Sequence, residues 1–264
     1  MKIIAAVLER SGDNARPYGE HRPLRLAELN LDPPRPGELL IRIDAAGLCH
    51  SDLSVVNGDR PRPMPMVIAH EATGIVEALG SAENPLFSIG DRVVLAFLPA
   101  RGECVRCLSR EDYMCPNGAA ASGEGRMLRG GYRLHDAGGD VHHHLGVSAF
   151  ASHAVIDRRS AVKIDGDVSP EIAALFGCAV LTGVGAVMNS AQLRPGESVI
   201  IYGLGGVSAS PRCSARWRAA GCRSWRSTRL PTSAPSPRKW ARSRWRRVTR
   251  SRRLRAMSPA APTW

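Results

Sequence analysis

SVIIYGLGGV, residues 198–207, joins a run of apolar residues to a glycine-rich turn. A buried strand that leads into such a turn is the usual opening of a β-α-β unit. The sequence therefore predicts that an α/β domain begins here. The expected pattern Gly-x-Gly-x-x-Gly starts with Gly203 and Gly205, but Ser208 stands where the third glycine belongs.

The composition changes at the end of this turn. Residues 1–207 hold 20 Lys and Arg against 24 Asp and Glu, whereas residues 208–264 hold 16 Lys and Arg and no acidic residue. All five Trp also lie in this last segment. Because the strand, turn and helix of one unit share a core, we predict that residues 208–264 are an aberrant basic tail, disordered or loosely helical, such as a frameshift would produce.

The net charge of +12 would by itself suggest a nucleic-acid partner. Residues 1–207 are mildly acidic, however, so we expect only non-specific nucleic-acid binding through the tail. A selected role for the tail, with Arg on phosphates and Trp on bases, is the alternative. No apolar run reaches 18 residues and the first residues lack a signal-peptide layout. We therefore expect no membrane partner and a cytoplasmic location.

The first 165 residues are predicted to be rich in short strands. Glycine and proline turns bound apolar or alternating segments, which is typical of a barrel-like β domain. The clearest of these segments are residues 39–44, 74–80, 91–96 and 151–157.

The pattern becomes helical after residue 165. Ser169 and Pro170 form a helix start, and a second helix is expected from Cys178 to Ala191. We therefore predict three segments: a β-rich domain over residues 1–165, the start of an α/β domain over 166–207, and the tail over 208–264.

Three residues far apart in the sequence form a candidate metal site: Cys49, His70 and Cys178. One imidazole and two thiolates are a three-ligand zinc set that leaves a fourth position open. Taken alone, Cys178 fits a buried small residue and His70 a hydrogen-bonded core histidine. Their polar neighbours favour a metal, and Asp52 is expected to accept the other ring N–H of His70.

Four blocks together resemble the zinc-dependent alcohol dehydrogenases of the medium-chain dehydrogenase/reductase superfamily, in their long zinc-containing form. The blocks are GLCHSD (47–52), AHEATG (69–74), GCAVLTG (177–183) and YGLGGV (202–207). Their order and spacing agree with the family through residue 207, about four fifths of the chain. The resemblance implies a mixed α/β protein, in which a GroES-like β-barrel catalytic domain precedes the start of a Rossmann coenzyme-binding domain.

The resemblance also implies roles for the residues of the metal site. Cys49, His70 and Cys178 would bind the catalytic zinc, with Glu71 as an acidic neighbour. Ser51 would begin the proton relay from the substrate hydroxyl. In the family the relay often continues through a histidine three residues later, where this sequence has Ser54.

The resemblance also implies which residues would contact the coenzyme. By resemblance, His50 would lie near the phosphates of NAD and Thr182 near its nicotinamide, while Gly203, Gly205 and Gly206 form the cofactor turn. An acidic residue about 20 positions later normally binds the ribose. No Asp or Glu follows Glu197, so this anchor is missing.

The implied function is oxidation of an alcohol to an aldehyde or ketone. Zinc would lower the pKa of the alcohol, and NAD would accept the hydride. We expect this activity to be impaired in the chain as written, with an inactive zinc-binding remnant as the alternative. The expected partner is a small alcohol or aldehyde, and the family's homo-oligomer is not expected to form. The pattern leaves open which alcohol is bound and whether NADP replaces NAD.

A second cysteine cluster resembles the family's four-cysteine structural zinc lobe. Cys104, Cys107 and Cys115 occupy its last three positions, but Arg101 stands at the first. Because a structural zinc needs four ligands, either free thiols or a weakly held zinc completed by water would result. We expect the three thiols to lie close together, with Arg101 turned away. The histidine run at residues 142–144 is expected to be structural.

Overall fold

The structure, a computed structural model, describes residues 1–81, 86–194 and 205–207. The chain divides after Leu181 into two units, and the first, Met1–Leu181, holds every strand that the structure describes. These strands are β1 (Lys2–Leu8), β2 (Leu24–Leu31), β3 (Glu38–Ala46), β4 (Met66–Val67), β5 (Ala72–Leu79), β6 (Arg92–Leu95), β7 (Leu134–Asp136), β8 (Gly139–His143), β9 (His153–Asp157) and β10 (Ala161–Lys163).

The helices of the first unit are short and lie mostly between strands. They are α1 (Tyr18–His21), α2 (His50–Asn57), α3 (Val105–Leu108), η1 (Asp112–Met114), α4 (Pro116–Gly123), η2 (Arg158–Ser160), α5 (Pro170–Ala174) and η3 (Leu175–Gly177). The helix α6 (Ala179–Gly185) crosses the division, and the π-helical segment η4 (Ala186–Ser190) belongs to the second unit.

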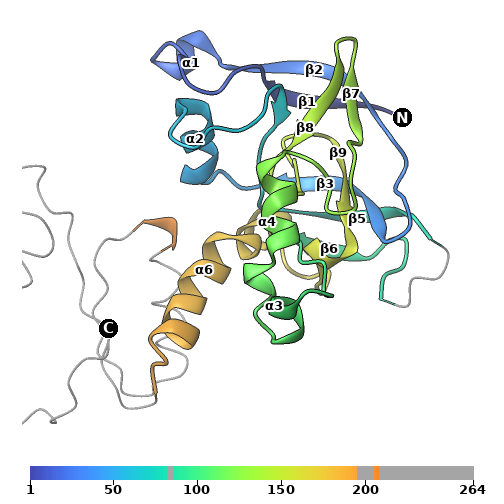
Figure 1. Ribbon diagram of the computed structural model, residues 1–264, viewed down its shortest axis with the longest axis vertical. Helices are drawn as coiled ribbons and strands as arrows, with labels where there is room; N and C mark the ends of the chain where they lie inside the picture. Colours follow the sequence, from blue (N-terminus) through green and yellow to red (C-terminus); the bar gives the residue numbers. More distant parts are fainter. Residues whose placement is uncertain (82–85, 195–204, 208–264) are drawn as a thin grey trace, which may run out of the picture. The chain divides into compact units, whose positions relative to one another are not determined.

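The strands form two sheets, which Figure 1 shows in the upper and middle parts of the first unit. One sheet closes into a barrel in the order β1-β2-β7-β8-β4. The other has the order β10-β6-β5-β3-β9, with β3 antiparallel to both β5 and β9. The predicted barrel-like β domain is confirmed, and the four strand segments named from the sequence correspond to β3, β5, β6 and β9.

Alternating burial explains how the strands make the core. In β1 the side chains of Ile3, Ala5 and Val7 are buried and pack inside the barrel, as the two-residue period of a strand requires. Leu39 and Ile41 of β3 are likewise buried, and they pack in the core beside the five-stranded sheet.

A buried ion pair connects the two sheets. The guanidinium of Arg133, just before β7, donates to both carboxylate oxygens of Glu38 at the start of β3, at 2.9 and 2.6 Å. Both side chains are fully buried. This bidentate pair fixes the barrel against the five-stranded sheet that carries the site described below.

The helical segments differ in part from the prediction. The helix α5 begins at Pro170 as expected, and it packs on β3, β5 and β6 within the first unit. The single helix expected over residues 178–191 is instead an α-helix followed by a π-helical turn. Gly183 and Gly185, which lower helix propensity, lie where the regular helix ends. The expected strand at 198–202 and the tail at 208–264 lie outside the described residues.

Among the described residues, no single helix is long and apolar enough to cross a membrane. The bent pair Pro170–Gly177 and Ala179–Ser190, with an angle of 52° between its parts, meets that requirement by length and composition only.

Candidate metal centre

The structure brings Cys49, His70 and Cys178 together. Cys49 lies at the junction of β3 and α2, His70 precedes β5, and Cys178 follows η3. One ligand atom from each lies within 4.8 Å of the others, and the two sulfurs are 4.0 Å apart. With Zn–S bonds of about 2.3 Å, tetrahedral geometry would place two sulfurs about 3.8 Å apart. The spacing and the donor set therefore both fit zinc.

Close backbone contacts place the ligands. A Cβ atom on Gly177 would lie 2.1 Å from the carbonyl oxygen of Leu95 in β6, so only glycine lets η3 approach the sheet here and deliver Cys178. Ala69 has φ of 77°, a left-handed conformation that costs free energy in a residue other than glycine. The turn at Ala69 directs the chain into His70.

Asp52 is the residue that joins the ligands to one another. Its Oδ1 accepts the Nδ1–H of His70 at 2.9 Å, and its Oδ2 accepts the backbone N–H of Cys49 at 3.0 Å. The second contact lies within the first turn of α2, as in a capping box. Because Nδ1 of His70 is used, Nε2 is left for a metal, which is the carboxylate–histidine arrangement of zinc sites.

The electrostatics of the site follow from these contacts. Burial alone would lower the pKa of His70, but Asp52 and Cys178 outweigh it and raise that pKa to about 10. Burial alone would likewise raise the pKa of Asp52, but His144 and His70 hold it well below its usual range. Asp52 is therefore an anion, and a metal must displace the proton that His70 otherwise carries.

An open cleft of about 660 Å³ adjoins Cys49. Its walls, all within the first unit, are mostly apolar. The residues that line it include Leu48, Leu53, Val56, Ile68 and Phe150, together with Tyr18, Arg22 and His50. The cleft thus opens beside the side chain of Cys49, one of the candidate ligands.

The predicted proton-relay and coenzyme residues lie either in α2, close to Cys49, or in the segment after Leu181. Ser51 is half-buried and His50 exposed in the first turn of α2, and the hydroxyl of Ser54 donates to the carbonyl of His50. Thr182 is exposed in α6 and belongs to the second unit. Gly205 and Gly206 are described as exposed, whereas Gly203 lies outside the described residues.

Glu71 has a contact with the chain that follows Cys178. Its carboxylate accepts the backbone N–H of Ala179 at 3.2 Å, and its side chain packs against Gly47, where a Cβ would lie 2.7 Å away. Burial raises the pKa of Glu71. Glu71 thus connects the segments of all three candidate ligands.

The histidine run contains a contact that the sequence analysis missed. His142 and His143 are structural: Nδ1 of His142 donates to the carbonyl of Pro65, and Nε2 of His143 accepts the N–H of Arg133. The buried His144, in contrast, has its Nδ1 3.3 Å from Oδ1 of Asp52. The run of three histidines was visible in the sequence, but nothing in the sequence indicated which of the three lies beside Asp52.

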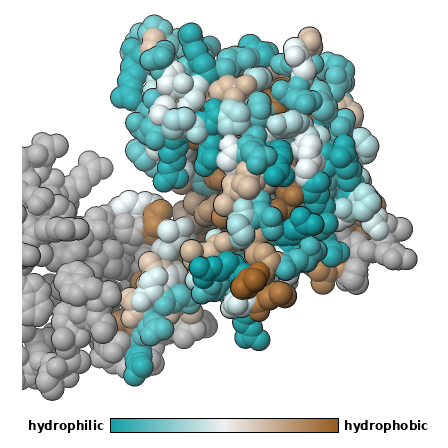
Figure 2. Space-filling model, viewed as in Figure 1, coloured by the Kyte–Doolittle hydropathy of each residue, from teal (hydrophilic) through white to brown (hydrophobic). Residues whose placement is uncertain are grey.

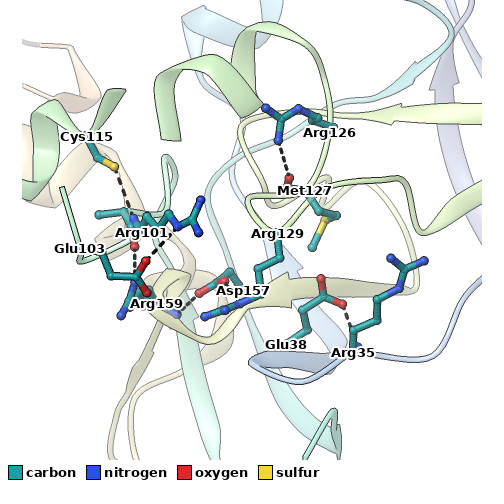
Figure 3. Close-up of polar contacts among 12 residues, drawn as sticks. Arg35, Glu38, Arg101, Glu103, Cys115, Arg126, Met127, Arg129, Asp157 and Arg159 are labelled. Atoms are coloured by element: carbon teal, nitrogen blue, oxygen red, sulfur yellow. Dashed lines mark hydrogen bonds and ion pairs between the residues drawn. The ribbon is translucent and has the colours of Figure 1, made fainter. Parts of the chain in front are cut away.

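The second cysteine cluster is also assembled. The sulfur atoms of Cys104, Cys107 and Cys115 lie within 4.8 Å of one another. Figure 3 shows the Arg101 side chain directed away from Cys115 and toward Glu103, to which it donates at 3.0 Å. The expectation that Arg101 turns away from the thiols is confirmed.

Comparison with known proteins agrees with this geometry. The alcohol dehydrogenase GroES-like domain matches residues 35–166, half of the chain. The chain belongs to the alcohol dehydrogenase family. The resemblance to the zinc-containing medium-chain members and the predicted GroES-like fold are thereby confirmed.

Individual relatives give the extent of the likeness. A Mycobacterium tuberculosis protein named "Putative alcohol dehydrogenase D" is 39% identical over 223 residues, which are 84% of this chain and 57% of that protein. An S-(hydroxymethyl)glutathione dehydrogenase of Synechocystis is 35% identical over 201 residues, 76% of this chain and 54% of the relative. The chain thus spans little more than half the length of these relatives.

Solved structures show the same partial coverage. An alcohol dehydrogenase zinc-binding domain protein from Burkholderia ambifaria superposes with a TM-score of 0.75 at 32% identity, covering 85% of this chain and 58% of that one. Benzyl alcohol dehydrogenase from Acinetobacter calcoaceticus superposes with a TM-score of 0.74 at 29% identity and the same coverage.

Proposed function

We propose that this chain carries the zinc centre of an alcohol-oxidising enzyme, with Cys49, His70 and Cys178 as the three protein ligands. The convergence of these ligand atoms within 4.8 Å carries the proposal, and the carboxylate of Asp52 behind His70 supports it. A zinc ion bound there would supply a Lewis acid that favours loss of the alcohol proton.

The residues around the ligands have distinct tasks in this proposal. Asp52 and Glu71 hold the segments that carry the ligands. The hydroxyl of Ser51, two residues after Cys49, receives the proton of the substrate. Ser54 does not extend this relay toward solvent, because its own hydroxyl donates back to the carbonyl of His50. The apolar cleft beside Cys49 receives the carbon chain of a small alcohol or aldehyde.

The hydride acceptor in this proposal is NAD. His50, Thr182, Gly203, Gly205 and Gly206 are its proposed contacts, by resemblance to the family. The missing acidic ribose anchor after Glu197 argues that NAD is held poorly. Since hydride transfer needs exact positioning of the nicotinamide, we propose that oxidation by this chain is strongly impaired.

The experiment is a measurement of bound zinc and of NAD-dependent alcohol oxidation on the purified 264-residue chain. We expect zinc to bind, His70→Ala to abolish that binding, and oxidation to be weak. His21→Ala, which changes an exposed histidine of α1, is the matched control and should keep its zinc. Zinc binding unaffected by His70→Ala would refute the assignment.

A second candidate is a zinc-binding protein with no dehydrogenase activity. The absence of any Asp or Glu after Glu197 favours it. Both candidates bind zinc, so NAD binding separates them: calorimetry that detects no NAD binding at millimolar concentration supports the second. The five described cysteines are free thiols, a state that the reducing cytoplasm maintains, and we propose that location for either.

A further inference from the structure

The lobe between β6 and β7 holds three sulfur atoms around one point. Sγ of Cys104 lies 3.3 Å from that of Cys107 and 4.0 Å from that of Cys115. The backbone N–H groups of Arg101 and Gly102 donate to the sulfurs of Cys115 and Cys107, at 3.4 and 3.3 Å. These two N–H···S contacts fix the positions of the Cys115 and Cys107 sulfurs, so that the lobe presents three sulfurs close together.

No fourth ligand joins the three sulfurs within the described part of the chain. No further thiol, imidazole or carboxylate shares their 4.8 Å sphere. Two acids of the lobe are occupied elsewhere, since Glu103 pairs with Arg101 and Glu111 pairs with Arg106 on the surface. A structural zinc needs a closed set of four protein ligands, and three sulfurs do not provide it.

We infer that this lobe is a three-thiolate site for a soft ion that requires only three ligands, namely trivalent arsenic. Thiolates select soft ions over hard ones. Arsenic in this oxidation state forms three bonds, and its lone pair occupies the remaining direction. Three thiolates therefore complete its coordination without a fourth ligand. Cys104 and Cys107 are only half-buried, which leaves the sulfurs open to a small solute.

The binding step balances without a change of oxidation state. Arsenous acid, As(OH)₃, exchanges its three hydroxyl groups for the three thiols: three As–S bonds form, three As–O bonds break, and three water molecules leave with the thiol protons. The product is neutral. No acidic ligand has to leave its arginine partner to balance the charge.

The lobe is distinct from the centre proposed above. That centre offers the two thiols of Cys49 and Cys178 and the imidazole of His70, so it lacks the third sulfur that trivalent arsenic requires. Failure of arsenic binding and failure of the zinc centre can therefore be told apart in one sample.

The experiment uses the full chain with Cys213→Ser and Cys222→Ser, reduced and loaded with one equivalent of zinc. Arsenous acid is titrated and followed by native mass spectrometry and by thiol alkylation with peptide mapping. We expect one arsenic per chain, protection of Cys104, Cys107 and Cys115, and retention of the zinc. Cys107→Ser should weaken binding about a hundredfold, because a chelate of three linked thiolates becomes one of two.

Two further variants test the role of the missing ligand. Arg101→Cys completes a four-thiolate set, so it should bind a second zinc when a second equivalent is added, and should then resist arsenic. Arg110→Cys adds a thiol to the same lobe outside the cluster and should do neither. Retained zinc at the first centre shows that each variant is folded. Equal arsenic binding by Cys107→Ser, or a second zinc in the unmodified lobe that excess arsenous acid does not displace, would overturn the inference.

Discussion

The carboxylate of Asp52 makes three contacts in and beside the candidate metal centre. It accepts from His70 and from the N–H of Cys49, and it faces His144 at 3.3 Å. Asp52→Asn keeps the shape but removes the charge that fixes the His70 ring. We expect zinc affinity to fall about 10- to 100-fold, measured by competition with a chromophoric chelator. Asp59→Asn, an exposed position, is the control, and equal affinities in the two variants would contradict this role.

His143 gives the fold a defined sensitivity to acid. Burial lowers its pKa from 6.5 to about 3, with Arg133 adding repulsion. Below pH 6.5 the unfolded chain takes up a proton that the folded chain excludes. The free energy of unfolding should therefore fall as the pH decreases from 6.5 toward 3, by at most about 1.4 kcal/mol per pH unit from this group.

The variant His143→Gln isolates this contribution. Glutamine keeps an acceptor for the N–H of Arg133 but does not titrate, so denaturant unfolding between pH 7 and 4 should show a smaller slope with pH. His142→Gln, which changes the half-buried neighbour, serves as the control. An unchanged slope in His143→Gln would show that other groups dominate the acid response.

At the scale of elements, η3 reaches β6 only because Gly177 has no side chain. A Cβ there would lie 2.1 Å from the carbonyl oxygen of Leu95. Gly177→Ala should therefore move Cys178, weaken zinc binding and cost roughly 1–3 kcal/mol of stability. Thermal unfolding and zinc competition measure both. Gly166→Ala meets no atom within 4 Å and should change neither, so matching losses in the two variants would contradict the argument.

The contact between the two sheets depends on one buried ion pair. Glu38→Gln leaves the fully buried guanidinium of Arg133 without its counter-charge, which should cost roughly 3–5 kcal/mol. Glu28→Gln breaks the exposed pair with Lys2 and should cost less than about 1 kcal/mol. Urea unfolding compares them, and a similar loss in both would mean that the buried pair does not hold the sheets together.

At the scale of the whole molecule, charge is divided unevenly along the sequence. Residues 208–264 carry 16 Lys and Arg and no acidic residue. We expect weak binding to DNA of any sequence, falling about 10³-fold or more between 50 and 200 mM salt. Fluorescence anisotropy with two unrelated duplexes tests this. A preference for one duplex that persists at high salt would instead indicate a selected nucleic-acid site.

The sequence by itself determined the family, the strand pattern and the candidate ligands. Short alternating segments bounded by glycine and proline predict strands because burial repeats every two residues. The order of the blocks that hold Cys49, His70 and Cys178 then pointed to one family. Each of these signals lies within a short stretch of neighbouring residues, so it can be recognised without the tertiary structure.

The sequence also indicated Asp52 behind His70, a contact that the structure contains. Only the tertiary structure decided which residues from distant segments meet around the ligands. The contact of His144 with Asp52 joins residues 92 positions apart, and the pair Glu38–Arg133 joins residues 95 apart. The close approach of Gly177 to Leu95 is likewise a matter of how an element packs on a sheet. Such contacts depend on the path of the chain between distant residues, because no local propensity or spacing specifies which side chains meet once the barrel closes.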